Sequence, residues 1–411
     1  MGSCRLVAKI IRGTYGYTLF IAYISIIGRT ILLEKFTMDS LTQATLGAAV
    51  GHLCWNNKVG NKALLLGAVG GTIPDLDILL YPFLDDIQRL YWHRGESHSI
   101  WFILLGSMVT GWLLSRYFKK EQLSFPAGAF GASLIYTTHI LIDYCTVYGT
   151  QLLAPLSRTP FALGNFFIID PLFTLPLLLG CAVAAISKPP LGKKANLAGL
   201  TMATCYMAWS FSAQTVADNT FRLALSNQNL NITRQRTTAG PFTTFLWRHV
   251  AETKDGFFLA YWSIFDAPKK PIQFHHIPRR SELIETISDA DTFAVVEWFS
   301  QGWWFAVDEE DNLIRIVDLR FTEIPSAHGQ THQQWEWPFA WRFDLQAPQK
   351  KSLFSVVPKV DAPLHTLKLL AARIRGGENW YSTSTNIAID ATITPKSPRN
   401  NYAKALKERT N

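Results

Sequence analysis

The sequence predicts a mixed fold, in which an all-α transmembrane bundle of about five to seven helices precedes a β-rich soluble domain. Long apolar runs fill the first half, whereas the second half alternates aromatic and charged residues. The 411 residues also exceed the roughly 100 to 200 of one ordinary domain. We therefore expect a membrane-embedded domain at 38–214, a β-rich extracytoplasmic domain at 215–390 and a flexible tail at 391–411.

Residues 1–37 are expected to form an N-terminal extension or an extra membrane helix. The run at 14–33 is apolar enough to span a bilayer, as a first helix or as an uncleaved signal-like segment. Met38 is an alternative natural start, because Asp39 and Ser40 precede the next apolar run as N-cap residues do.

Six further helices are expected in the first half. The first is rich in glycine and alanine, which permits close helix contact, and Pro74 is expected to kink or break the second. Asp170 followed by Pro171 is interpreted as a helix N-cap with proline at the first helical position. The predicted helices are 41–54, 62–80, 98–117, 126–145, 168–187 and 195–213.

The charge pattern predicts an inner-membrane protein with its helix ends sorted by side. The net charge is +8, and basic residues gather between apolar runs at Lys58 and Lys62, at 116–120 and at 188–194. Such a bias places these turns in the cytoplasm and sends everything after residue 214 to the outer side. A basic stripe interleaved with aromatic residues is missing from the sequence, so nucleic acid is not expected as a direct partner.

The second half predicts a compact domain of roughly five to seven strands, because period-two runs there are bounded by turn residues. The clearest candidates are 257–266, 292–308, 313–321 and 339–345. All five cysteines lie in the first half and lack the Cys-x-x-Cys spacing, so neither thiolate zinc nor thioredoxin chemistry is supported.

Acidic and imidazole groups lie between the apolar helices and predict a divalent metal site. A charged group inside a bilayer costs about 2.5 kcal/mol or more, so a cluster of them indicates function. His139 and Asp143 are four residues apart on one helix face, which allows them to share an ion. The alternative is a polar loop whose carboxylates only cap helices. The candidate metal ligands are Asp75, Asp77, His93, His98, His139 and Asp143.

These ligands suit one or two ions of zinc or manganese. A bound ion would lower the pKa of water and favour hydrolysis of an ester. Asp77 and Arg94 are the candidate catalytic residues, and Arg158 is a second candidate for phosphate. Both arginines are equally compatible with a side chain that reaches for lipid headgroups. Ser97 is expected to cap the next helix, and the role of His52 stays open.

Motifs in the first half resemble, in combination, the bacterial inner-membrane metal-dependent hydrolases of the LexA-regulated, domain-of-unknown-function (YdjM-like) type. The resemblance covers roughly residues 38–190 and implies an integral inner-membrane protein, with the acidic and histidine motifs as metal ligands. It does not supply a substrate. The motifs lie at 38–43, 74–77, 93–99, 138–143, 148–151 and 168–171.

Two functional hypotheses follow. The first is a metal-dependent hydrolase that acts on a membrane lipid or a lipid-linked ester, with a phosphoester as the favoured substrate, at the outer face of the inner membrane. The second is a non-catalytic scaffold or envelope-stress protein whose β domain binds a partner. A transporter fits less well, because the polar residues gather at one rim and the sequence shows no repeat.

Overall fold

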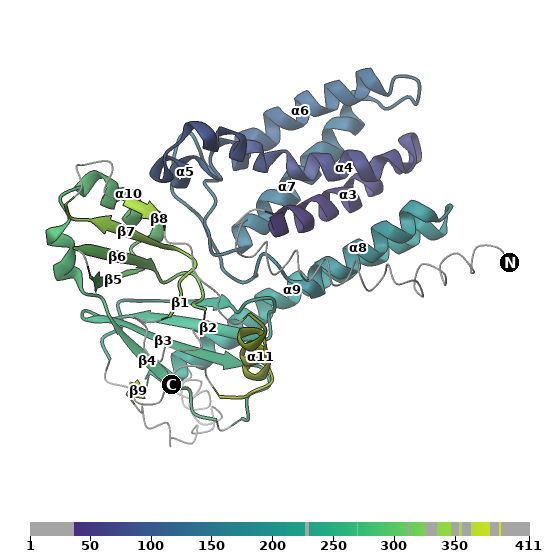
Figure 1. Ribbon diagram of the computed structural model, residues 1–411. Coiled ribbons are helices and arrows are strands. Elements are labelled where there is room, and N and C mark those ends of the chain that lie inside the picture. The colour runs from purple at the N-terminus through teal and green to yellow at the C-terminus, as the bar shows by residue number, and fades with distance from the viewer. Residues whose placement is uncertain are drawn as a thin grey trace, which may run out of the picture.

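The computed structural model of the chain describes residues 37–226, 230–268, 270–310, 312–324, 335–346, 353–355, 363–378 and 386–387. The predicted helix at 14–33 and the predicted tail at 391–411 lie outside these ranges. Within them, apolar helices fill the first half and two β-sheets the second (Figure 1), which confirms the predicted fold class.

The helical half matches the predicted order of helices. Helices α6 and α7 are long and apolar enough to cross a membrane, and α4 with η1 would make a third span bent by 47°. The bend falls at Pro74, the first residue of η1, as the sequence predicts. The elements are α3 (Thr37–Val59), α4 (Lys62–Thr72), η1 (Pro74–Phe83), α5 (Asp86–Trp92), η2 (Glu96–His98), α6 (Ile100–Tyr117), α7 (Phe125–Cys145), α8 (Pro171–Ile186) and α9 (Leu191–Ser226).

Glycines join α3 to α4 at backbone contact, as the small-residue pattern predicts. A Cβ atom on Gly67 would collide with the carbonyl oxygen of Gly47, and one on Gly71 would collide with the carbonyl oxygen of Gln43. Only glycine permits this approach. The contact sets the position of the end of α4, where the polar residues begin.

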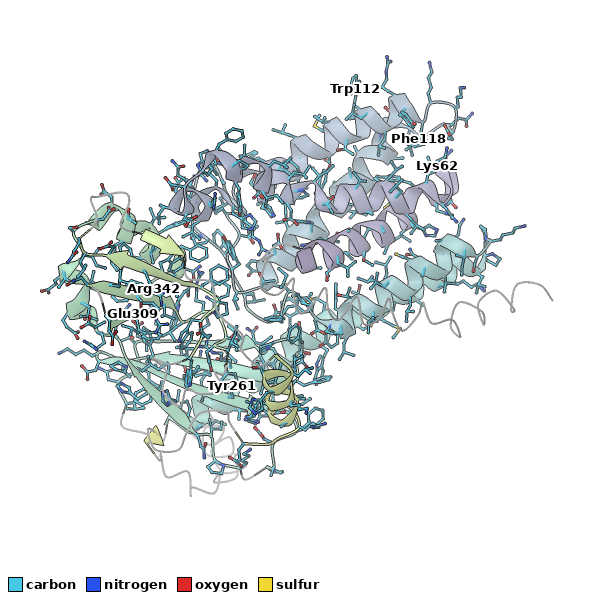
Figure 2. All side chains as sticks on the ribbon, viewed as in Figure 1. Lys62, Trp112, Phe118, Tyr261, Glu309 and Arg342 are labelled. Carbon is cyan, nitrogen blue, oxygen red and sulfur yellow. The ribbon has the colours of Figure 1, made fainter. Side chains whose placement is uncertain are left out.

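The basic segments meet at one end of the helical half. Lys62 lies 3.6 Å from Glu121 in the loop after α6, and Lys193 at the start of α9 donates to Asn57 at the end of α3. Figure 2 shows Lys62 and Phe118 at the end of the helices farthest from the sheets. The predicted acidic and histidine ligands all lie toward the opposite ends of their helices.

Two antiparallel sheets form the second half, one of five strands in the order β1-β2-β3-β4-β9 and one of four in the order β5-β6-β7-β8. These are more strands than the predicted five to seven, since several are short and carry no clear alternation. The strands are β1 (Arg234–Ala239), β2 (Leu246–Glu252), β3 (Gly256–Ser263), β4 (Phe274–Pro278), β5 (Trp304–Glu309), β6 (Leu313–Asp318), β7 (Ala340–Asp344), β8 (Leu353–Ser355) and β9 (Asn386–Ile387).

The prediction of one strand across 292–308 is wrong. Helix α10 (Ala290–Ser300) takes the first part, and β5 begins only at Trp304. Asp289 caps the helix, and Phe293, Val296 and Phe299 are buried at helical spacing. The aromatic and β-branched composition of this segment is typical of a strand, but the spacing of its buried residues is that of a helix. The described residues of this half also form η3 (Ser281–Thr286) and α11 (Pro363–Ile374).

Helix α9 ties the two halves together. It continues past residue 214, and its last turns pack Ala217, Phe221 and Leu225 against Trp247 and Phe258 of the first sheet. Figure 1 shows it running from beside the helices to the back of that sheet.

A buried histidine lies under α9. The ring of His249 stacks on Phe221 with centroids 4.6 Å apart, and its Nδ1 lies 2.8 Å from the hydroxyl of Thr237. That hydroxyl donates to Asp218, so it accepts from Nδ1 of His249. Nε2 is buried without a hydrogen-bond partner among the described residues. Burial lowers the pKa of His249 from its ordinary value of 6.5 to about 3.

We predict that replacing Gly67 with alanine lowers the free energy of unfolding by about 1–3 kcal/mol, because the new methyl group must push two backbones apart. Thermal unfolding in detergent measures the effect. Gly70→Ala on the same helix is the matched control, since its Cβ would lie 3.4 and 3.6 Å from methyl groups of Ile135. Equal midpoints for the two variants would contradict the proposed role of the glycine contact.

Acid should weaken the β half through His249. The pKa of His249 is lower in the folded chain than in the unfolded chain, so below about pH 6.5 only the unfolded chain takes up this proton. The free energy of unfolding therefore has its full value above about pH 6.5 and falls by up to about 1.4 kcal/mol per pH unit as the pH drops toward 3. Denaturant unfolding of wild type and His249→Gln at pH 7 and pH 5 isolates this group. We expect a smaller loss of stability on acidification in the variant than in wild type, whereas parallel losses would exclude His249 as the cause.

Candidate metal centre

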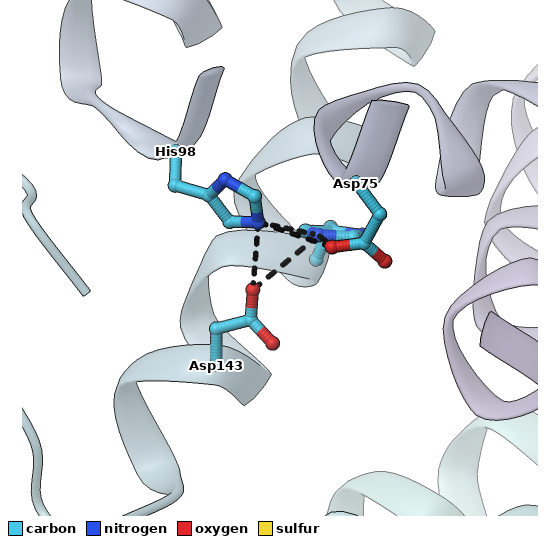
Figure 3. Close-up of side chains that lie close together, drawn as sticks. Asp75, His98 and Asp143 are labelled. Carbon is cyan, nitrogen blue, oxygen red and sulfur yellow. Dashed lines mark hydrogen bonds and ion pairs between the residues drawn. The ribbon is translucent and has the colours of Figure 1, made fainter. Parts of the chain in front are cut away.

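Four side chains from three elements converge on one point. Asp75 comes from η1, His98 from η2, and His139 and Asp143 from α7 (Figure 3). Each offers one ligand atom, and these four atoms all lie within 4.8 Å of one another. The side chains of His98, His139 and Asp143 are at most 1% exposed, whereas that of Asp75 is 16% exposed.

The distances have the size of a tetrahedral coordination sphere. Nε2 of His98 lies 3.2 Å from Oδ1 of Asp75 and 3.1 Å from Oδ2 of Asp143, and Nε2 of His139 lies 3.4 Å from each of those oxygens. The two Nε2 atoms are 3.3 Å apart. Nitrogen and oxygen donors about 2.0–2.1 Å from a central ion are about 3.3 Å from each other in a regular tetrahedron. Five of the six donor separations are therefore already close to those that an ion such as Zn²⁺ requires.

Hydrogen bonds orient the histidines for this role. Nδ1 of His139 lies 2.7 Å from the carbonyl oxygen of Gly71, which only accepts, so the ring proton is on Nδ1 and the lone pair of Nε2 faces the cluster. Nδ1 of His98 lies 2.9 Å from the hydroxyl of Ser97. The predicted cap of α6 is thus wrong by two residues, because Ser99 accepts from the backbone of Phe102 while Ser97 serves the histidine.

The second carboxylate is held from behind. Oδ1 of Asp143 accepts from Nε2 of Gln43 at 3.0 Å and lies 3.1 Å from the guanidinium of Arg94. Its Oδ2 is buried and faces the Nε2 atoms of His98 and His139, at 3.1 and 3.4 Å. One oxygen is therefore fixed by the protein, and the other is presented to the centre of the cluster, as in a metal site with an ordered outer shell.

The electrostatics of the cluster favour a cation. Burial alone would lower the pKa of His98, but the carboxylates of Asp143 and Asp75 reverse this and hold its pKa above the ordinary value of 6.5. Two carboxylates directed at the same point repel each other, and a bound cation relieves that repulsion. The donor set, the five known separations near 3.3 Å and the inward-facing oxygen of Asp143 all fit one divalent ion.

Two predicted ligands form a neighbouring pair instead. Nδ1 of His93 lies 3.2 Å from Oδ2 of Asp77, and the same oxygen accepts from the backbone nitrogen of Arg94 at 2.9 Å. Oδ2 of Asp77 lies 3.9 Å from Nδ1 of His98, on the side of that ring away from the cluster. The structure thus brings four of the six predicted ligands together and places Asp77 and His93 behind them.

The remaining candidates have other neighbours. Arg94 is 2% exposed and is directed at Asp143 and Thr146. Arg158 pairs with Glu96 and donates to Gln151 at 3.0 Å. His52 is 3% exposed and does not belong to the cluster.

Sequence reasoning placed Gln43 in the motif at 38–43 without assigning it a role, and it missed Gly71. The signal for Gln43 was a polar side chain in an apolar helix rich in glycine and alanine. Gly71 contributes a backbone carbonyl, for which the sequence carries no signal.

The Uncharacterized protein YfhP of Bacillus subtilis (strain 168) is 28% identical over 153 residues, which are 36% of this chain. The chain spans about half the length of that relative, 46% of it. No solved structure matches. Together with the apolar helices, the matching family identifies a membrane protein. Residues 38–217 match the model of the YdjM inner membrane protein family, which confirms the resemblance predicted from the motifs.

Proposed function

We propose that the protein is a metal-dependent hydrolase of the bacterial inner membrane, acting on a lipid or lipid-linked phosphoester at the outer face. The proposal rests on the cluster of Asp75, His98, His139 and Asp143 in a bundle of apolar helices. Two imidazole nitrogens and two carboxylate oxygens are a donor set for Zn²⁺ or Mn²⁺. One ion would fit this cluster, and when bound it would polarise a phosphoryl oxygen or lower the pKa of a water molecule.

The pair of Asp77 and His93 is suited to move a proton beside the ion. Asp77 orients the imidazole through Nδ1, so the other ring nitrogen would take up or deliver the proton of the attacking water or the leaving group. Both side chains are less than 10% exposed, which excludes competing bulk water. Arg94 acts as a positioning residue, because its guanidinium holds Asp143 and its backbone nitrogen holds Asp77.

The surface at η1 supports a lipid substrate. Asp75 is the most exposed of the four ligands, so an incoming group would reach the ion past η1. The neighbouring side chains on that element are apolar and exposed, with Leu76 at 48%, Leu79 at 65% and Phe83 at 83%. An acyl or prenyl chain would lie against them, which leaves the phosphoester at the level of Asp75.

The proposed orientation is multi-pass, with the β half in the periplasm. The basic turns lie at one end of the helices and the cluster at the other. Basic residues favour the cytoplasmic side, so the cluster would face outward. Helix α9 would carry the chain to the same outer side.

One observation favours the scaffold hypothesis. Four protein donors fill a tetrahedron, whereas catalytic zinc sites usually keep a position open for water. A closed site would make the ion structural, and the β half would then bind a partner. The hydrolase requires expansion to five ligands or movement of Asp75, the least enclosed donor.

Metal content is the first test. We expect full-length protein purified in detergent to hold about one zinc or manganese ion per chain by elemental analysis, and His139→Ala and Asp143→Ala to lose most of it. His52→Ala is the matched control, since His52 is a buried histidine of the same bundle outside the cluster. Metal-free wild type, or equal loss in the control, would refute the metal centre.

Turnover separates the two hypotheses. The metal-loaded protein should release phosphate from a long-chain phosphate monoester or a diacylglycerol phosphate in micelles, and more slowly from a soluble aryl phosphate. We expect His93→Ala to lower kcat about 10²–10⁴-fold while the metal content stays at the wild-type level. Stoichiometric metal with no turnover of any ester would favour the scaffold.

A further inference from the structure

We propose that the second sheet and α10 form a permanent cap that completes the metal centre, so that Phe299, Phe339 and Arg320 are positioning residues for an ion that they do not touch. The inference rests on the proposed metal centre but concerns a part of the chain outside the family match, which ends at residue 217. The term cap refers to α10, β5 to β8 and the described residues of the loops between them.

Tyr148 is the side chain through which the cap acts. On one side its ring meets His93 edge-on at 5.2 Å between centroids, and the guanidinium carbon of Arg94 lies 5.0 Å over it. On the other side its ring packs against Phe299 at 5.0 Å and Phe339 at 5.8 Å. The ring of Tyr148 thus lies between Phe299 and Phe339 of the cap on one side and His93 and Arg94 on the other.

The cap also holds the backbone at this point. Arg320 donates to the carbonyl oxygen of Tyr148 at 3.0 Å, and its charge is paired with Asp318. The guanidinium of Arg320 also lies 4.6 Å over the ring of Phe299. Both members of the ion pair are fully buried, so the donor has one fixed direction.

A second pair of contacts fixes the segment that follows. Trp298 donates from Nε1 to the carbonyl oxygen of Arg158 at 3.1 Å, and Gln301 donates from Nε2 to that of Pro160 at 2.7 Å. Residues 148–160 are therefore held to the cap at both ends. Figure 1 shows α5, which precedes His93, facing α10, and Ile87 and Leu90 of α5 pack into the same apolar cluster as Phe299.

These contacts lead to the ligands in two steps. Arg94, whose guanidinium packs on the ring of Tyr148, forms an ion pair with Oδ1 of Asp143, and its backbone nitrogen donates to Asp77. If the contact of Tyr148 with the cap is weakened, Arg94 gains room to turn away. Asp143 then loses one of the two groups that direct its Oδ2 to the cluster. Donor separations near 3.3 Å tolerate little drift, so the affinity for the ion should fall.

Zinc affinity of the full-length protein in detergent tests the proposal, measured by competition with a chelator. Phe299→Ala removes the wall behind Tyr148, and we expect it to raise the dissociation constant for Zn²⁺ about tenfold. Phe305→Ala is the matched control, because Phe305 is equally buried in the cap but packs in the core between the sheets. It should leave the dissociation constant within about twofold of wild type at a comparable loss of stability.

A milder variant guards against misfolding. Gln301→Asn shortens the donor to Pro160, and asparagine tolerates the left-handed conformation of this position, where φ is 54°. It should weaken zinc binding in the same direction by a smaller factor. Wild-type affinity in both Phe299→Ala and Gln301→Asn, or an equal loss in Phe305→Ala, would overturn the cap. Failure of wild type to bind zinc would overturn the metal centre itself.

Discussion

Two carboxylates buried against two imidazoles set the requirements for the rest of the molecule. Asp143 is completely enclosed and Asp75 nearly so, and both face the same two Nε2 atoms. A carboxylate in an apolar bundle is costly unless opposite charge or hydrogen bonds compensate it. Gln43 and Arg94 compensate one oxygen of Asp143 only. The inner oxygens are left to a cation, and the helices around them serve to keep four donors at fixed separations.

Local sequence rules explain how the helices deliver these donors. The glycine contact between α3 and α4 brings the carbonyl oxygen of Gly71 to Nδ1 of His139. The break at Pro74 turns the chain by 47°, which directs Asp75 toward α7 instead of along the axis of α4. Ser99 then starts α6 immediately after His98, so that ring is held at a helix entry. Each ligand other than the pair on α7 is placed where a helix ends or begins.

The sequence could predict that ligands from separate elements share one site, but not which of the six candidates meet at its centre. His139 and Asp143 follow from helical spacing alone, since residues four apart share a face. Asp75 and Asp77 looked equivalent, because a spacing of two across a turn does not say which side chain faces inward. Aromatic and β-branched residues likewise suggested one strand at 292–308. The structure has α10 there instead, with every third or fourth residue buried. Tertiary packing decided both cases, and packing is not encoded in local pattern.

The β half is attached to the helices at two separate places, and this bears on why it affects the site. Gln214 on α9 donates to the carbonyl oxygens of Leu163 and Thr237, which joins helix, loop and first sheet. The second attachment is the cap around Tyr148. One attachment would allow the sheets to swing about α9, whereas two restrict that motion. The residues behind the ligands therefore lie between α9 and the cap, and a domain whose described residues contribute no ligand still limits how far Asp143 can move.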